Sequence, residues 1–185
     1  MPTLKAGMPN NRHPERGGGF TLVELLVVMF IISLFTAFTL PRLADIGELR
    51  LNGAARHLGR TITYLYAEAV SSRKVVRLYV DMDKGKYYPA TMNSKGEFEK
   101  TSFPLFTSGS LGAGLEVKSF VTVFSGAFGG NMAYLHLMPE GFAEKTVIVL
   151  GDESGRLVSL IVDPLTGGVR VEPGKVGIDY EAGAA

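Results

Sequence analysis

The sequence contains no cysteine among its 185 residues. This excludes a disulfide framework and a thiolate metal site, and it is compatible with either redox compartment. A domain outside the cytoplasm would therefore depend on its core alone. Histidine is also scarce: the three that occur lie in separate segments and cannot form a dense metal cluster, namely His13, His57 and His136.

Recognisable catalytic patterns are absent as well. There is no serine-hydrolase or zinc-protease motif, so we predict no enzymatic activity, no cofactor and no metal site. The spacing of Asp81, Asp83 and Gly85 partly matches a calcium loop but lacks its sixth-position glycine and terminal glutamate. The glycine-rich stretch 125–131 has no phosphate-binding spacing, and we interpret it as a flexible connection.

A basic excess is missing too. The formal net charge is +1, and beyond Ser72 acidic and basic residues are nearly balanced. A domain that binds nucleic acid usually carries a clear basic surplus, so nucleic acid is not an expected partner. The last charged residues of the chain are net acidic: Glu172, Lys175, Asp179 and Glu181.

The most distinctive feature present is an apolar run from Phe20 to Leu40, in which Glu24 is the only charged residue. As a helix these 21 residues would be about 31 Å long, close to the hydrocarbon thickness of a bilayer. The preceding leader is mainly basic, which predicts that it stays in the cytoplasm. The run is longer than the core of a secretory signal, and no small-residue cleavage site follows it.

Three glycines precede the run, and the order Gly19-Phe20-Thr21-Leu22 is followed by Glu24 and, at the end of the run, by Pro41. This pattern resembles the class III signal of type IV pilins and type II secretion pseudopilins. The resemblance implies that prepilin peptidase cleaves between Gly19 and Phe20 and methylates the new amino terminus at Phe20. It also implies that Glu24 pairs with the terminal amino group of a neighbouring subunit.

Glu24 has a second interpretation that needs no partner. With Thr21 as N-cap and Glu24 at the third helical position, the pair forms a capping box that satisfies amides at the start of the helix. A carboxylate within a membrane segment is nevertheless costly unless it is paired, and such residues are usually functional. The two interpretations are compatible, because capping applies before assembly.

Helical periodicity continues beyond the apolar run to Ser72. Pro41 lacks an amide proton, and we predict a continued helix with a bend there. An apolar stripe follows, which we expect to pack on a sheet: Leu51, Ala55, Leu58, Ile62, Leu65 and Ala69. Three glycines lower the helix propensity and would permit close approach of another subunit or bending: Gly47, Gly53 and Gly59.

The remainder alternates short β-rich runs with turns, which predicts about seven antiparallel strands. The expected strands are 75–81, 86–92, 115–124, 133–138, 146–150, 156–162 and 169–172. Residues 93–114 are expected to be loop. The segments HLMPEG, TVIVL and RLVSLIVDPLTGGVRV resemble the carboxyl-terminal signature of the GspH/FimT family. This resemblance implies an α+β, type IV pilin-like fold, with a long amino-terminal helix packed on an antiparallel β-sandwich.

We therefore predict five segments. They are a cleaved cytoplasmic leader (1–19), a transmembrane half-helix (20–40), a periplasmic half-helix (41–72), a globular β domain (73–172) and a flexible tail (173–185). The expected location is the inner membrane, with a single crossing, a cytoplasmic amino terminus and a periplasmic domain that assembles into a pseudopilus.

The resemblance implies a minor, H-type pseudopilin of the type II secretion pseudopilus, which helps to drive folded exoproteins across the outer membrane. Its implied partners are other major and minor pseudopilins, prepilin peptidase, the inner-membrane assembly platform and the lipid bilayer. One alternative is a FimT-like minor type IV pilin involved in pilus assembly or DNA uptake. Another is an ordinary periplasmic protein that keeps its signal as an anchor.

Overall fold

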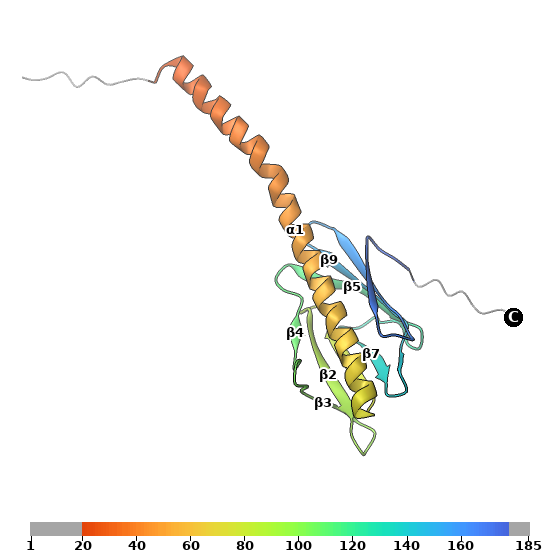
Figure 1. The fold of residues 1–185 in the computed structure, drawn as a ribbon. Helices are drawn as coiled ribbons and strands as arrows, with labels where there is room; N and C mark the ends of the chain where they lie inside the picture. Colours follow the sequence, from red (N-terminus) through yellow and green to blue (C-terminus); the bar gives the residue numbers. More distant parts are fainter. Residues whose placement is uncertain (1–19, 178–185) are drawn as a thin grey trace, which may run out of the picture. The chain divides into compact units, whose positions relative to one another are not determined.

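The described chain begins with a long helix, α1 (Leu22–Ser72), followed by eleven strands (Figure 1). The structure is a computed structural model that describes residues 20–177, without the side chains of residues 38–46. The chain divides into two compact units, the first ending at Arg42 and the second starting at Leu43.

Helix α1 has a defined signal at each end. The Thr21 hydroxyl accepts a hydrogen bond from the Glu24 amide at 3.2 Å, the geometry of an N-cap. At the other end Arg73 adopts a left-handed conformation (φ 53°), and the Lys74 amide bonds back to the Ala69 carbonyl at 3.3 Å. The helix continues through Pro41, and the bend expected there stays a prediction.

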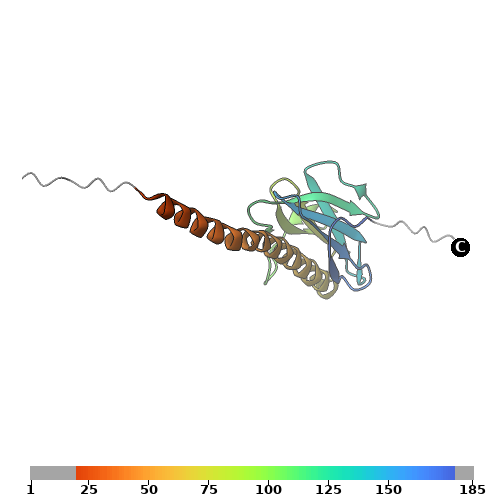
Figure 2. The same ribbon diagram turned by 90° about the horizontal axis from the view of Figure 1, so that it is seen from above.

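The second unit buries the predicted stripe of α1. All six residues are at most 2% exposed: Leu51, Ala55, Leu58, Ile62, Leu65 and Ala69. Figure 2 shows this part of the helix lying against the strands. The stripe prediction is confirmed, because a spacing of three and four residues places these side chains on one face of the helix.

Two antiparallel sheets complete the core. The first has the order β3-β2-β1-β7-β8, and β4 pairs with β2. Its strands are β1 (Val76–Asp81), β2 (Lys86–Met92), β3 (Phe98–Lys100), β4 (Gly109–Ser110), β7 (Met132–Met138) and β8 (Phe142–Ala143). The second has the order β11-β10-β9-β5-β6. Its strands are β5 (Leu115–Thr122), β6 (Gly126–Ala127), β9 (Thr146–Asp152), β10 (Leu157–Val162) and β11 (Val169–Pro173).

The seven longer strands lie where the sequence predicted them, to within a few residues. The count of about seven was too low because β3, β4, β6 and β8, which have two or three residues each, lie in segments expected to be loops or turns. Strands this short show no alternation of polar and apolar residues. They form only because the fold brings them beside a longer strand.

Pro89 lies inside β2, which has neighbours on both sides. On the outer side, β4 pairs with Lys86 and Tyr87, while β3 pairs with residues 90–92. The Pro89 carbonyl points to that side, where it accepts the Thr101 amide at 3.0 Å. The missing amide proton of Pro89 therefore falls in the gap between β3 and β4, and the ladder with β1 loses nothing.

The second part of α1 contacts both sheets. On one flank, a methyl group added to Gly59 would lie 3.2 Å from the Val169 side chain of β11. On the other flank, His57 Nδ1 lies 2.9 Å from the Tyr87 hydroxyl of β2. Gly59 thus permits close approach of this chain's own strand, and the approach of another subunit stays a prediction. Gly53, by contrast, faces open space.

Candidate functional site

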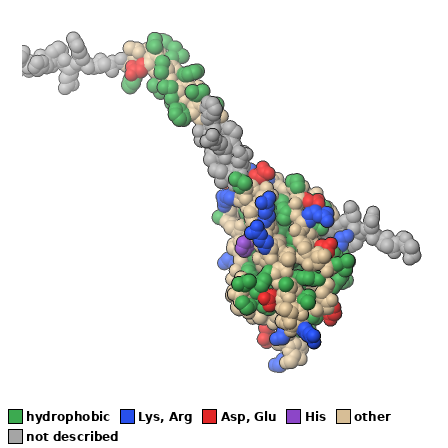
Figure 3. All heavy atoms as spheres, viewed as in Figure 1, with side chains coloured by type: hydrophobic (Ala, Val, Ile, Leu, Met, Phe, Trp, Pro, Cys, Tyr) green, Lys and Arg blue, Asp and Glu red, His purple; other side chains and the backbone are tan. Residues whose placement is uncertain are grey.

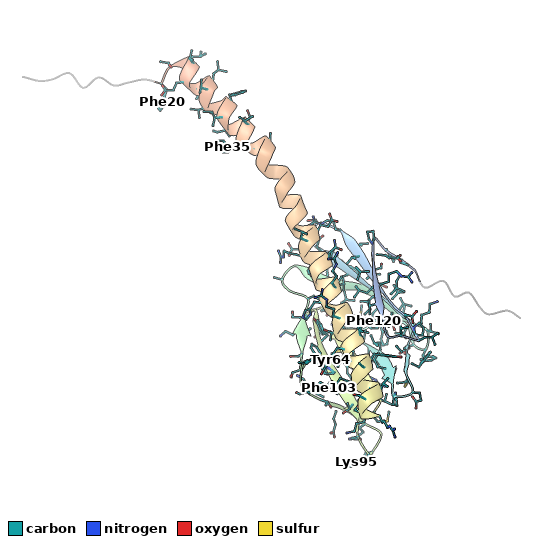
Figure 4. All side chains as sticks on the ribbon, viewed as in Figure 1. Phe20, Phe35, Tyr64, Lys95, Phe103 and Phe120 are labelled. Carbon is teal, nitrogen blue, oxygen red and sulfur yellow. The ribbon has the colours of Figure 1, made fainter. Side chains whose placement is uncertain are left out.

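The first part of α1 is apolar on all sides and exposed on all sides. Every residue from 20 to 37 is exposed, including Phe20 at 83% and Phe35 at 70%, both labelled in Figure 4. Large apolar patches of this size on a protein surface mark a contact with another protein or with lipid. This segment is therefore the first candidate for a functional surface.

Glu24 lies in the first turn of this apolar segment. Its amide bonds to Thr21, so the N-cap half of the proposed capping box is present. Its carboxylate is exposed and has no ion-pair partner within residues 20–177. Glu24 therefore contributes to the start of the helix through its backbone while the carboxylate stays available to a partner.

Gly19, the other side of the expected cleavage point, lies outside the described residues, as do His13 and the rest of the leader. Cleavage after Gly19 and methylation of Phe20 thus remain predictions.

Among the helical residues whose side chains are described, no stretch is both long enough and apolar enough to cross a membrane. The span predicted from the sequence, 20–40, includes three residues whose side chains lie outside that description. It therefore also remains a prediction.

The two histidines of the second unit have structural partners. His57 bonds to Tyr87, as described above. His136, on β7, lies between the Arg77 guanidinium and the Glu144 carboxylate. Its Nε2 lies 3.0 Å from Arg77 Nε and its Nδ1 lies 3.1 Å from Glu144 Oε2. Since arginine can only donate, Nε2 must accept, and the proton is assigned to Nδ1, which donates to Glu144.

Glu144 is fully buried, yet it has several donors. Burial alone would raise the pKa of its carboxyl, but hydrogen bonds from the His136 and Thr122 side chains outweigh it. Amide donors from His136 and Phe124 add to them. The net result is a pKa below the ordinary value. Because Phe124 follows β5 and His136 belongs to β7, the carboxylate links the two sheets.

Aromatic rings surround the Arg77 guanidinium on the outer face of the first sheet. Its carbon lies 3.6 Å from the Phe98 ring centroid and 4.3 Å from that of Tyr134, and Nη1 donates to the Tyr79 hydroxyl at 2.8 Å. Cation–π contacts of this kind stabilise a partly buried guanidinium. This cluster is fully satisfied internally, which indicates a structural role.

The calcium-like spacing has another explanation in the structure. Asp81 Oδ1 accepts the Lys84 amide at 2.9 Å within the β1–β2 turn, and Asp83 bonds to the Asn131 side chain. Within residues 20–177, no group of three or more acidic, histidine or cysteine side chains is arranged to hold a metal ion.

A hollow of about 250 Å³ lies beside the start of the buried stripe and contains charges of both signs. Arg50 donates to the Ala113 carbonyl at 2.7 Å, and Arg156 pairs with Asp152 at 2.7 Å. Burial opposes the ionisation of Asp152, but hydrogen bonds from Arg156 and Ser154 lower its pKa. The paired charges favour a structural role for this hollow.

Sequence reasoning missed the row of hydrogen bonds that joins Arg77, His136 and Glu144. The alternation of Arg77 with Tyr79, and of His136 with Tyr134, was a usable signal that both pairs share one sheet face. The approach of Glu144, from the connection after β8, depends on tertiary structure and has no sequence signal.

A comparison with known protein families finds a motif that overlaps the exposed segment 20–37. Residues 16–40 match the prokaryotic N-terminal methylation motif. No curated protein matches the sequence significantly.

Solved structures match the described fold. A minor pseudopilin EpsH from the type 2 secretion system of Vibrio cholerae has 13% identity and a TM-score of 0.53, covering 67% of this chain and 97% of that one. A second EpsH structure has 14% identity and a TM-score of 0.55, with coverages of 69% and 97%.

Escherichia coli GspH has 8% identity and a TM-score of 0.51, with coverages of 70% and 91%. At these identities the likeness establishes the fold, and the methylation motif is independent of it. The chain therefore combines the N-terminal methylation motif with the α+β fold of GspH-like minor pseudopilins.

Proposed function

We propose that this protein is a minor pseudopilin, a non-enzymatic structural subunit of a type II secretion pseudopilus. The observation that carries the proposal is the apolar segment 20–37, whose side chains are all exposed and whose single carboxylate, Glu24, has no partner in the described chain. Such a surface requires lipid or other subunits to cover it.

In this proposal the leader 1–19 is removed by prepilin peptidase, and residues 20–40 hold the protein in the inner membrane. Residues 41–72 and the β domain 73–172 then lie in the periplasm, followed by the tail 173–185. Glu24 would pair with the terminal amino group of a neighbouring subunit, because a buried carboxylate is stabilised by an opposite charge. The assembly platform would then extract subunits from the bilayer into the fibre.

Removal of the leader is tested by mass spectrometry of the protein purified from membranes. We expect a chain that begins at methylated Phe20 when prepilin peptidase is present, and an intact leader when it is absent. Retention of residues 1–19 in both strains would contradict the pseudopilin proposal.

The role of Glu24 is tested by Glu24→Ala, with Glu48→Ala, an exposed carboxylate on the same helix, as the control. We expect the first variant to reach the membrane in normal amount but to lose cross-linking to other pseudopilins, while the control keeps it. Equal cross-linking of both variants would remove the assembly role.

Which fibre the subunit serves is a separate question. A deletion strain should lose secretion of folded exoproteins and keep pilus-dependent DNA uptake. The opposite result would favour the FimT-like alternative.

A further inference from the structure

His136 lies between two charged groups, and its contacts with them depend on its protonation state. Its Nε2 lies 3.0 Å from Arg77 Nε and 2.6 Å from Arg77 Nη2. Since both arginine nitrogens can only donate, this contact requires a ring nitrogen without a proton. On the opposite side of the ring, Nδ1 donates to the Glu144 carboxylate at 3.1 Å. A neutral imidazole satisfies both neighbours, and a protonated one does not.

Protonation of His136 would occur at Nε2, because Nδ1 already carries a proton. The new N–H would point at two N–H groups of a cation, so the hydrogen bonds from Arg77 would be lost. The bond from Nδ1 to Glu144 would be kept and strengthened, since both partners would then be charged. Arg77 is therefore the neighbour that must move.

Glu144 keeps its negative charge while the histidine titrates. Although burial opposes the ionisation of its carboxyl, hydrogen bonds from His136 and Thr122 lower its pKa. The carboxylate is also held by the amides of Phe124 and His136. It therefore fixes the imidazole in place in both protonation states.

The other groups around the imidazole add no charge. Within residues 20–177, its hydrogen bonds and ring contacts involve four side chains, namely those of Arg77 (β1), Phe98 (β3), Tyr134 (β7) and Glu144. Phenylalanine has no titratable group, and a tyrosine phenol is neutral in the acidic range. The electrostatic balance at the imidazole is thus set by one cation and one anion.

The charged residues of β3 have partners of their own. The Lys100 ammonium nitrogen lies 5.2 Å from the ring centroid of Tyr88. Glu99 Oε1 accepts the side-chain amide of Asn93 at 2.8 Å. Neither residue is among the contacts of the imidazole, so neither replaces Arg77 there.

Arg77 connects the histidine to the edge strand β3. Its guanidinium carbon lies 3.6 Å from the Phe98 ring centroid, and Phe98 is the first residue of β3. This strand has three residues, lies at the end of its sheet and pairs with β2 only at residues 90–92. An edge segment with so few backbone pairs opens locally before the rest of a sheet. Displacement of Arg77 would remove the side-chain contact that covers it.

We propose that Arg77, His136 and Glu144 form a pH-sensitive contact, in which protonation of His136 at Nε2 displaces the Arg77 guanidinium and loosens β3. Imidazole is the side chain whose charge ordinarily changes between about pH 5 and 8. The edge is thus firmly paired at neutral pH and loosens when the surroundings become mildly acidic. This inference concerns the β domain by itself and does not rest on the proposed function.

The absence of tryptophan allows a direct test in the full-length protein in detergent. Phe98→Trp places one indole where the Phe98 ring contacts Arg77. When the pH falls from about 7.5 to about 5.5, we expect its quenching constant for acrylamide to rise at least about twofold. Addition of His136→Gln should abolish the rise, because the glutamine amide accepts from Arg77 and donates to Glu144 without titrating.

His57→Gln is the matched control for this measurement. His57 is the other histidine of the described residues, and it is exposed on α1, where it bonds to Tyr87. Figure 3 shows histidine at the surface on the face where α1 lies. Its replacement should leave the pH response of the indole unchanged.

A quenching constant that does not change with pH would overturn the proposal. A rise that survives His136→Gln, or one that disappears with His57→Gln, would do the same. Loss of the helical circular dichroism signal at the lower pH would also overturn it, because the change would then be global unfolding.

An independent readout uses the protein without a reporter. Nitrogen-15 NMR of histidine-labelled protein should show His136 with a protonated Nδ1 and an unprotonated Nε2 at neutral pH, and a proton gained at Nε2 by about pH 5. The signal is assigned by its absence in His136→Gln. The opposite tautomer at neutral pH, or a ring that stays neutral at the lower pH, would contradict the proposal. Neither measurement depends on fibre assembly, so this inference and the proposed function can fail separately.

Discussion

Two stretches of α1 are rich in the same apolar residues and have opposite surroundings. Residues 20–37 are all exposed, whereas the stripe from Leu51 to Ala69 is buried by the sheets of its own chain. The first stretch is apolar around its whole circumference, and the second on one face only. An apolar face can be covered by one domain, but a fully apolar helix needs surroundings on every side. The pattern around the helix thus separates the stretch that the chain's own sheets bury from the stretch that stays exposed.

The largest effect should come from the buried stripe. Leu58→Ala is expected to lower the free energy of unfolding by about 3–5 kcal/mol, because it leaves a cavity in a fully buried site. Val27→Ala, in the exposed stretch, should change it by less than about 0.5 kcal/mol. Urea unfolding of the full chain in detergent, followed by circular dichroism, measures both. Similar losses would erase the distinction between the two stretches.

The same comparison extends to two carboxylates, the buried Glu144 and the exposed Glu24. Glu144→Gln should cost about 2–3 kcal/mol at neutral pH, since hydrogen bonds to a charged acceptor are the strong ones. Glu24→Gln should leave domain unfolding unchanged. Unfolding by urea at neutral pH measures both variants.

The pKa of Glu144 gives this comparison a pH dependence. Because its pKa is lowered in the folded state, its contribution is complete above the unfolded value of about 4.5 and is lost as the pH falls through the folded value. The wild-type protein should therefore lose stability below about pH 4.5, and Glu144→Gln should lose less. Parallel pH profiles would show that the carboxylate contributes nothing as an anion.

The smallest effect distinguishes positions within the second stretch. Gly53→Ala should stabilise the protein by about 0.5–1 kcal/mol, because alanine has the higher helix propensity and the site is open. Gly59→Ala should fall short of that gain by about 1 kcal/mol, because its methyl group would lie 3.2 Å from Val169. Thermal unfolding of the two variants in parallel is the measurement. An equal gain at both sites would show that Val169 of β11 can move away from the added methyl group without loss of stability.

Much of the fold was predictable because its signals are local. The stripe of α1 follows helical periodicity, and the seven longer strands show alternation bounded by turns. The four shortest strands were missed because two or three residues carry no periodicity. Within the candidate site, the roles of Phe20 and Glu24 come from a linear motif and remain predictions. The row of hydrogen bonds that joins Arg77, His136 and Glu144 was not predictable, because its members come from distant parts of the sequence.

The sequence by itself determined where the helix begins, which face of its second stretch is buried, and that its first stretch is almost uncharged. These properties depend on the order of residues along one element. Only the tertiary structure decided that β11 packs closely against α1 at Gly59 and that the Glu144 carboxylate accepts hydrogen bonds from both sheets. It also decided that Arg56 and Arg60 line one groove. Those features arise from contacts between segments that lie far apart in the chain, and local patterns carry no information about such contacts.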